Sequence, residues 1–415
     1  MTIVVLLILA GITISLVFSE NGIIAKAKEA AEKTNQAVIN EQEQMNDVLG
    51  YLENALNGIG GGNTPSKPEG CPVEKFEKWD KTSNDKVNAV ESADKVLVPV
   101  PKGYTASSVS MENKVAEGFV IYEGQEAVTD TNVDTARTTR NQFVWVPVAN
   151  PSEMYGKDEK CKKWGKLYEF SASGITPLNW TEQDGVMSIT ATSGSDSYRE
   201  PDVVTGSNGT QYDADNSNLQ QAGLDSSATA STFKTQLETE FNNMIASVEK
   251  YGGFYIGRYE TGNLSQEKVC VIKNNSDINN QTWYTMYKKA KGIAVNSNVT
   301  SSMIWGSQWD ATMRWMHNSG NAEKKKYTYD SRGKGNYSSD SPIATGSIEA
   351  YAVNNIYDMA GNVSDWTIEA YLTYDRVYRG GIYNDGDGDG PASRRNGGDP
   401  TNSIGIFGFR VALYM

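Results

Sequence analysis

The 415 residues carry 38 Lys and Arg against 51 Asp and Glu, which gives a formal net charge of −13 and a pI of about 4.8. Because nucleic-acid binding requires a basic face, this acidic balance argues against a nucleic-acid partner. The balance suits a secreted or surface protein kept soluble by self-repulsion. The length predicts one large domain with an extension, or two domains.

The N-terminal segment predicts two helices in succession. Residues 2–18 are almost wholly apolar, at the short end for a membrane span, and lack the basic start and cleavage site of a secretory signal. Over 23–57, apolar residues recur at three- and four-residue steps, which predicts an amphipathic helix. This pair resembles the N-terminal spine of type IV pilin-like proteins, although the basic leader and the usual glutamate are absent. The resemblance implies that residues 1–57 anchor the chain in a membrane or pilus-like filament at a bacterial cell surface.

Residues 58–70 are rich in Gly, Pro, Asn and Ser, which is typical of a flexible tether. The globular part is therefore expected over 71–415. Short runs of β-branched and aromatic residues punctuated by Pro and Gly predict strands at 96–100, 119–122, 143–148 and 254–261. The polar stretch 193–231 is expected to form a long mobile surface loop. A helix bearing Phe241, Ile245 and Val248 on one face is expected after it.

Three cysteines, Cys71, Cys161 and Cys270, lie far apart without a C-x-x-C pair, so a zinc site is not expected. Three buried free thiols are the favoured interpretation, and one disulfide with one free thiol is the alternative. The single histidine, His317, lies in a predicted amphipathic helix over 309–317, where a structural role is expected.

A family resemblance is carried by the C-terminal part of the chain. The stretch 354–367 (NNIYDMAGNVSDWT), the triplet 379–381 (RGG) and the end 408–413 (GFRVAL) are similar to the formylglycine-generating-enzyme, or sulfatase-modifying-factor, family. The resemblance implies an α+β chain: a pilin-like helix followed by a C-type-lectin-like domain. The family's enzymes carry two cysteines in register near Asp385 and Gly390, and neither position is a cysteine here. A non-catalytic binding module is therefore predicted; the alternatives are a formylglycine-generating-type enzyme and a structural pilin-like subunit.

The same resemblance implies a calcium site. In the family, the matching segment binds calcium through the side chains at Asp358 and Asp365 and the carbonyls at Gly361 and Val363. Calcium prefers such oxygen ligands. The alternative is that the two acids only cap turns around a buried Trp366.

The region about 379–415 resembles the variable region of proteins diversified by retroelements, which use this lectin-like fold. Those systems mutate adenines in Asn codons, and the residue types reachable from such codons make up most of 382–407. The run 385–390 also resembles the start of an EF-hand loop, but Asn396 replaces the bidentate Glu and Pro391 occupies a carbonyl-donating position, so an exposed acidic loop is expected. A protein or cell-surface ligand is the predicted partner of this face. The predicted ligand-binding residues are Ile382, Tyr383, Asn384, Asp385, Asp387, Asp389, Arg394, Asn396, Asp399 and Ile406.

Some remaining polar and aromatic residues are candidates for sugar chemistry. Surface positions on strands or helices are nevertheless the expected default for four acids, Glu260, Asp310, Asp365 and Glu369. Core positions are expected for four indoles, Trp305, Trp309, Trp315 and Trp366.

Overall fold

The computed structural model describes residues 71, 74, 76–158, 160–178, 180–183, 186–189, 198–206, 209–265, 268–276, 279–294, 296–386 and 390–415. Residues 70–415 form one compact unit. The predicted N-terminal helices (1–57) and tether (58–70) lie outside the described residues. Within these ranges, every helix is too short or too polar to cross a bilayer.

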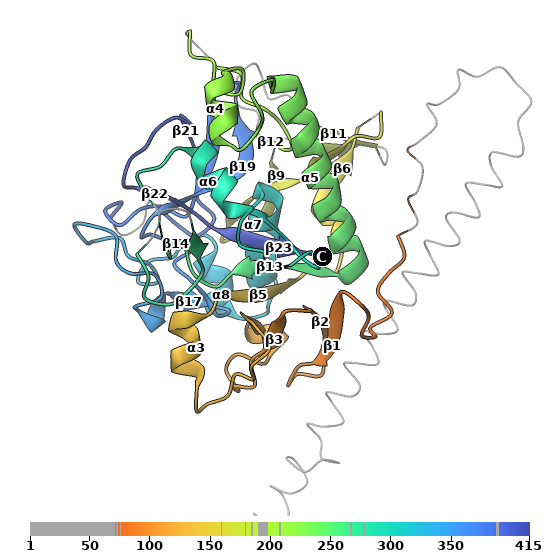
Figure 1. Cartoon of the computed structure of the whole chain (residues 1–415), viewed down its shortest axis with the longest axis vertical. Coiled ribbons are helices and arrows are strands. Elements are labelled where there is room, and N and C mark those ends of the chain that lie inside the picture. Colours follow the sequence, from red (N-terminus) through yellow and green to blue (C-terminus); the bar gives the residue numbers. More distant parts are fainter. Residues whose placement is uncertain are drawn as a thin grey trace, which may run out of the picture. The chain divides into compact units, whose positions relative to one another are not determined.

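The long helix α5 covers one side of the domain (Figure 1). The described helices are α3 (Val133–Thr139), α4 (Asn216–Gln221), α5 (Ala230–Tyr251), α6 (Trp283–Ala290), α7 (Gly306–His317) and α8 (Ala322–Tyr327), with 3-10 turns η1 (Val115–Glu117), η2 (Pro151–Glu153) and η3 (Glu349–Tyr351). Thr229 and Thr232 form a capping box that starts α5, and Gly252, with φ 77°, ends it in the left-handed conformation. The predicted apolar face is buried, which confirms the helix.

A six-stranded antiparallel sheet forms the base of the domain, in the order β16-β23-β13-β5-β4-β3. Its strands are β3 (Tyr104–Ala106), β4 (Val120–Glu123), β5 (Gln142–Pro147), β13 (Gly253–Gly257), β16 (Thr300–Met303) and β23 (Val411–Tyr414). The C-terminal strand β23 lies between β13 and β16, so the end of the chain completes the sheet. Three of the predicted strands are confirmed here as β4, β5 and β13, although β13 ends at Gly257 rather than at Thr261.

A second, five-stranded sheet carries the C-terminal loops. It has the order β12-β19-β20-β21, and β22 pairs with β19 in parallel. Its strands are β12 (Tyr198–Arg199), β19 (Ser364–Tyr371), β20 (Asp375–Arg379), β21 (Arg395–Gly398) and β22 (Phe407–Phe409). Hairpins complete the fold: β1 (Val87–Glu91) with β2 (Leu97–Pro101), β6 (Tyr155–Lys157) with β7 (Lys163–Gly165), β8 (Leu167–Ser171) with β9 (Gly174–Leu178), β10 (Trp180–Gln183) with β11 (Val186–Ile189), β14 (Gly262–Asn263) with β15 (Val269–Cys270), and β17 (Ala352–Val353) with β18 (Ile356–Tyr357).

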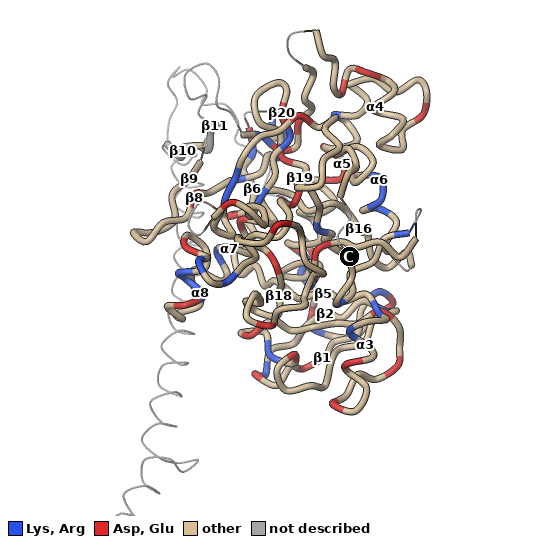
Figure 2. The backbone as a smooth tube through the Cα atoms, turned by 90° about the vertical axis from the view of Figure 1, so that its left-hand side faces the viewer, with Lys and Arg blue, Asp and Glu red and all other residues tan. Residues whose placement is uncertain are grey.

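Helix α7 contacts both sheets, β5 in the first and β19 in the second. Its residues Trp309, Met313 and Met316 are buried in one hydrophobic core that runs from Val87 to Tyr414. The predicted α+β class is confirmed at this level. Basic and acidic residues are interspersed along the chain rather than segregated onto one face (Figure 2).

The prediction of a long mobile loop over 193–231 is wrong for much of its described part. This stretch contains β12, α4 and the buried residues Glu200, Val204 and Asp213. Asp213 accepts hydrogen bonds from Arg376 (2.6 Å) and Tyr284 (2.8 Å). A polar composition therefore packs here because partners distant in sequence satisfy its buried charges.

Candidate ligand-binding face

The turn after β18 is built from residues with left-handed backbones. Gly361 has φ 74°, and a Cβ there would lie 2.3 Å from the Asn336 carbonyl oxygen, so only glycine fits. The buried Asn362 side chain donates to Glu260 Oε2 at 2.6 Å and accepts from the Ile343 amide at 2.8 Å. The turn leads into Trp366, which is fully buried.

The two acids of the predicted calcium site are bound to protein donors. Asp358 Oδ2 accepts from the Thr345 hydroxyl (2.9 Å) and the Gly346 amide (2.8 Å). Asp365 Oδ2 accepts from Arg410 Nε at 3.1 Å. Burial raises the pKa of Asp365 to about 6, although Arg410 opposes the shift.

Cation ligands are only partly supplied at this turn. Among the described residues, Asp365 Oδ1 is buried without a hydrogen-bond partner, which leaves one oxygen for a cation. Nowhere in the described ranges do three or more His, Cys, Asp or Glu side chains gather to hold a metal. Arg410 supplies positive charge beside Asp365. Calcium at Asp358, Gly361, Val363 and Asp365 stays a prediction.

The turn also fixes two long C-terminal loops. The first, 380–394, joins β20 to β21, and the second, 399–406, joins β21 to β22. The Tyr383 amide donates to the Asn362 carbonyl at 2.9 Å, and the Ser364 amide donates to the Ile406 carbonyl at 2.9 Å. Two neighbouring positions of one turn therefore hold both loops.

Both ends of loop 380–394 are clamped by one buried carboxylate. Arg379 and Arg395 are register partners across β20 and β21. Arg379 donates to Asp310 Oδ1, and Arg395 donates to Asp310 Oδ2 at 2.6 Å. Glu369 on β19 lies 2.8 Å from Arg395 Nε and 3.6 Å from Arg379 Nη1. We call these four residues the charge clamp.

The charge clamp continues to the start of helix α7. Glu200 accepts from the Gly306 amide at 2.8 Å and from the Ser307 amide at 2.9 Å, the first free amides of that helix. Burial, with the nearby Glu369 carboxylate, raises the pKa of Glu200 to about 8. Glu200 was not among the predicted site residues. No signal in its polar surroundings marks it, because its partners are more than 100 positions away.

The predicted ligand-binding residues divide into three groups by exposure and contact. Asn384 and Asn396 are exposed. Partly buried positions are Ile382, Tyr383, Asp385, Arg394, Asp399 and Ile406. Asp387 and Asp389 lie outside the described residues.

Not all of these side chains are available to a ligand. Asp385 Oδ2 accepts from the Ile382 amide at 2.8 Å and pairs with Arg394. Asp399 accepts from the Thr401 amide at 2.8 Å, and it follows the opposite end of β21 from Arg394. The predicted positions therefore span the length of one strand, and Asp385 has a structural role within the loop.

The expectation of surface positions for four acids is wrong. Glu260, Asp310, Asp365 and Glu369 are each at most 1% exposed, and each has a polar partner within the protein. Buried charges require such partners, and a single sequence does not reveal them. Among the four indoles, Trp305, Trp309 and Trp366 are buried as predicted, whereas Trp315 is partly buried. His317 is structural as expected: its Nδ1 lies 2.8 Å from the Thr328 hydroxyl.

Residues 287–415 match the Sulfatase-modifying factor enzyme 1-like domain. The match covers the C-terminal third of the chain, and the predicted family resemblance is confirmed there. No curated protein matches the chain in a sequence comparison.

Among solved structures, CarF is similar at 16% identity, covering 39% of this chain and 87% of its own, with a TM-score of 0.27. PvdO from Pseudomonas aeruginosa is similar at 17% identity, covering 40% and 82%, with a TM-score of 0.24. The Treponema denticola variable protein 1 is similar at 12% identity, covering 66% and 96%, with a TM-score of 0.24.

Proposed function

We propose that this chain is a ligand-binding protein whose diversified face is formed by loops 380–394 and 399–406 and by the exposed Asn396 of β21 between them. The observation that carries the proposal is the charge clamp. Asp310 holds the residues on both sides of loop 380–394 through two buried guanidiniums. Residues that fix the loop's ends therefore lie outside the loop, and its contents can change while its ends stay in place.

The chemistry of the exposed positions supports a protein or cell-surface ligand. Asn384, Asn396, Asn402 and Ser403 are exposed, and Tyr383 is partly exposed. Tyr gives contact area at low entropic cost, while Asn and Ser give adaptable hydrogen bonds, as in antibody paratopes. Binding residues on loops above a rigid base are the common arrangement for recognition.

A pair of displayed libraries tests the proposal. The first randomises Asn384, Asn396, Asn402 and Ser403, and the control library randomises four exposed positions near α3, namely Gln125, Glu126, Asp130 and Asp134. Both libraries are sorted for folding and then against one biotinylated globular protein. We expect both to fold and only the first to yield binders. Loss of folding in most first-library members, or equal enrichment from both, would contradict the proposal.

We propose further that the domain is not a cysteine-dependent oxidase. The positions that match the family's cysteine pair are near Asp385 and Gly390, and all three cysteines of the chain precede residue 271. Copper- and oxygen-dependent conversion of a cysteine-containing sulfatase peptide should be at the level of a protein-free control. Conversion above that level would restore the enzyme alternative.

Display at a bacterial cell surface, through residues 1–57 in a membrane or pilus-like filament, is part of the same proposal. The apolar run 2–18 supports it, because such a run favours a lipid or helix-packed environment. Protease added to intact cells should digest residues 71–415. Protection of these residues until the cells are lysed would argue against surface display.

A further inference from the structure

A strap of residues at the start of the compact unit crosses the β6–β7 hairpin and helix α5. We define the strap as Cys71, Glu74 and residues 76–80. Glu74 pairs with Lys163 of β7 at 2.7 Å, and the Lys163 ammonium lies 4.9 Å from the Phe76 ring centroid. The Trp79 amide donates to the Lys250 carbonyl at the end of α5 at 2.9 Å.

The strap residues belong to no helix or strand. Apart from Trp79, which packs against Tyr251 and the hydrophobic core, these single side-chain and backbone contacts hold them to the domain. Surface ion pairs of this kind contribute little, and segments held this way open at low free energy. The strap thus lacks a strong attachment at its first described residue.

Cys71 and Cys161 meet at the tip of the hairpin. The Asp158 carbonyl oxygen accepts from Cys71 Sγ at 3.3 Å and from the Cys161 amide at 2.9 Å. A hydrogen bond between the two thiols raises the pKa of Cys161. Both side chains are only partly buried, so solutes can reach them.

The backbone at Cys161 gives a second, independent observation. Its φ is 63°, in the left-handed region where Gly and Asn are the usual residues. Asp158 Oδ1 holds the turn there through the Lys162 amide at 2.8 Å. A cysteine at such a position carries a conformational cost and brings no apolar burial, and such outliers often mark a functional constraint.

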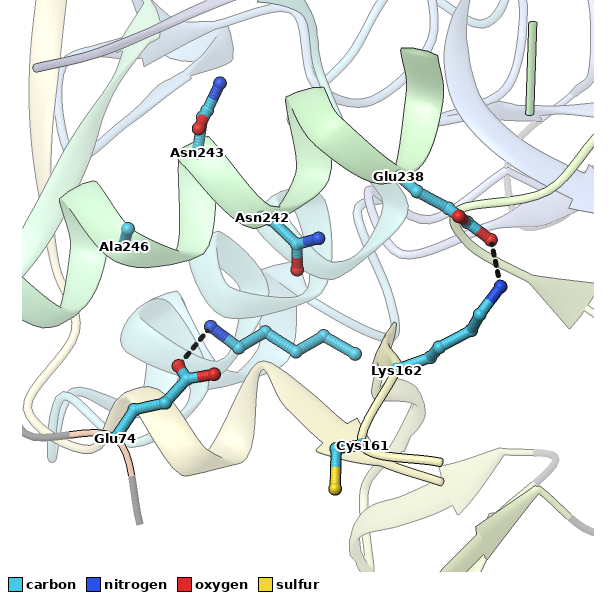
Figure 3. Close-up of a pocket in the computed structure, with 8 residues that line it drawn as sticks. Glu74, Cys161, Lys162, Glu238, Asn242, Asn243 and Ala246 are labelled. Atoms are coloured by element: carbon cyan, nitrogen blue, oxygen red, sulfur yellow. Dashed lines mark hydrogen bonds and ion pairs between the residues drawn. The ribbon is translucent and has the colours of Figure 1, made fainter. Parts of the chain in front are cut away.

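A cleft of about 410 Å³ separates the hairpin from α5 next to this pair. In Figure 3, Glu238 and Asn242 reach into it from the helix, while the Cys161 thiol points away from the helix. The cleft lining includes Glu74 of the strap and Lys162 of the hairpin turn. Cys161 is itself one of the residues that line this cleft.

We propose that Cys71 and Cys161 form a disulfide that locks the strap to the β6–β7 hairpin, with a small-molecule or protein disulfide as the oxidant. One thiolate attacks the donor disulfide, joins one of its sulfurs and releases the other half as a thiol. The second thiolate displaces the remaining half, so two protein thiols become one disulfide as one donor disulfide becomes two thiols. The link closes a loop of about 90 residues, which strongly restricts the unfolded chain.

The test uses the full chain, reduced, desalted and then incubated with oxidised glutathione. Thiols titrated after denaturation should fall from three to one, and a non-reducing digest should contain Cys71 joined to Cys161. Cys270 is the internal control, because it is buried and its pKa is raised to about 11 by burial. The Cys270→Ser variant should fall from two thiols to none, whereas Cys161→Ser should form no internal link.

A second measurement follows the strap itself. Trypsin cleavage after the exposed Lys78 should be slowed about threefold or more by oxidation in the parent, and not in Cys161→Ser. The melting temperature of the oxidised parent should rise by about 5 °C. Separate glutathione adducts on Cys71 and Cys161, a link to Cys270, or equal cleavage rates before and after oxidation would overturn the proposal.

Discussion

Replacing Asp310 removes the shared partner of two buried guanidiniums. Its carboxylate accepts from Arg379, from Arg395 at 2.6 Å and from the Tyr168 amide at 2.8 Å, and the residue is buried. Removing one member of a buried ion pair costs about 3–5 kcal/mol, because the remaining charge stays buried. Glu369 remains beside both arginines, so we expect the lower end of that range for the charges.

The loss of unfolding free energy depends on which residue replaces Asp310. Asp310→Asn keeps one acceptor and should lose about 3 kcal/mol, whereas Asp310→Ala also strands the Tyr168 amide, at about 1–3 kcal/mol more. Because whole domains are stable by only about 5–15 kcal/mol, the alanine variant should be close to unfolding under native conditions. The asparagine variant is therefore the one to measure.

Urea unfolding followed by tryptophan fluorescence and far-ultraviolet circular dichroism gives the free energies, provided the two signals coincide. Glu91→Gln is the matched control, because its pair with Lys95 is exposed and its loss should leave the midpoint unchanged. Arg395→Met should cost less in the Asp310→Asn background than in the parent, since the pair is already broken. A loss below about 1 kcal/mol for Asp310→Asn would refute the clamp.

Three further outcomes are expected. Glu200 stays protonated in the folded state up to about pH 8 but ionises near its ordinary pKa of 4.5 when unfolded, so its contribution to stability falls as the pH rises from 4.5 to 8. Glu200→Gln should flatten the dependence of the unfolding free energy on pH in this window, as measured by urea titrations. An unchanged dependence would contradict the raised pKa. Asp365→Asn should lower the melting temperature in calcium and in chelator alike, while an equal parent melting temperature in both would favour the capped turn over a bound ion. Trp366→Ala should lower the free energy of unfolding in urea by about 3–5 kcal/mol. The double variant Asn384→Ser, Asn396→Ser should change it by only about 0.5 kcal/mol. A loss from the double variant as large as that from Trp366→Ala would show that the two asparagines have a structural role.

Local patterns in the sequence were sufficient for the elements whose causes are local. The apolar face of α5 follows from the spacing of Phe241, Ile245 and Val248, and β5 follows from its run of apolar residues. The tight backbone of the Asp358–Trp366 turn also has a local cause, because left-handed conformations favour its glycine and asparagine.

Local sequence patterns did not predict the buried charged residues. Asp310 looked like an ordinary helical acid, and its role depends on Arg379 and Arg395, which are brought to it by the β20–β21 register. Glu200 lies in a stretch whose composition predicts disorder, and it is buried because the start of α7 supplies two amides. Polar residues are read as exposed unless a partner is known, and here the partners are set by the tertiary fold.

Two adjacent arginines show how the face and its base are separated. Arg394 lies within loop 380–394 and pairs with the partly exposed Asp385, whereas Arg395 begins β21 and is buried against Asp310 and Glu369. The proposed function requires the contents of loop 380–394 to change, so the position of the loop cannot depend on its own packing and its ends need contacts that do not involve the loop. Guanidinium–carboxylate pairs suit this role because they are directional and fix register, whereas apolar contacts tolerate slippage. We infer that exchanging Arg394 alters what the face binds, while exchanging Arg395 displaces the face as a whole.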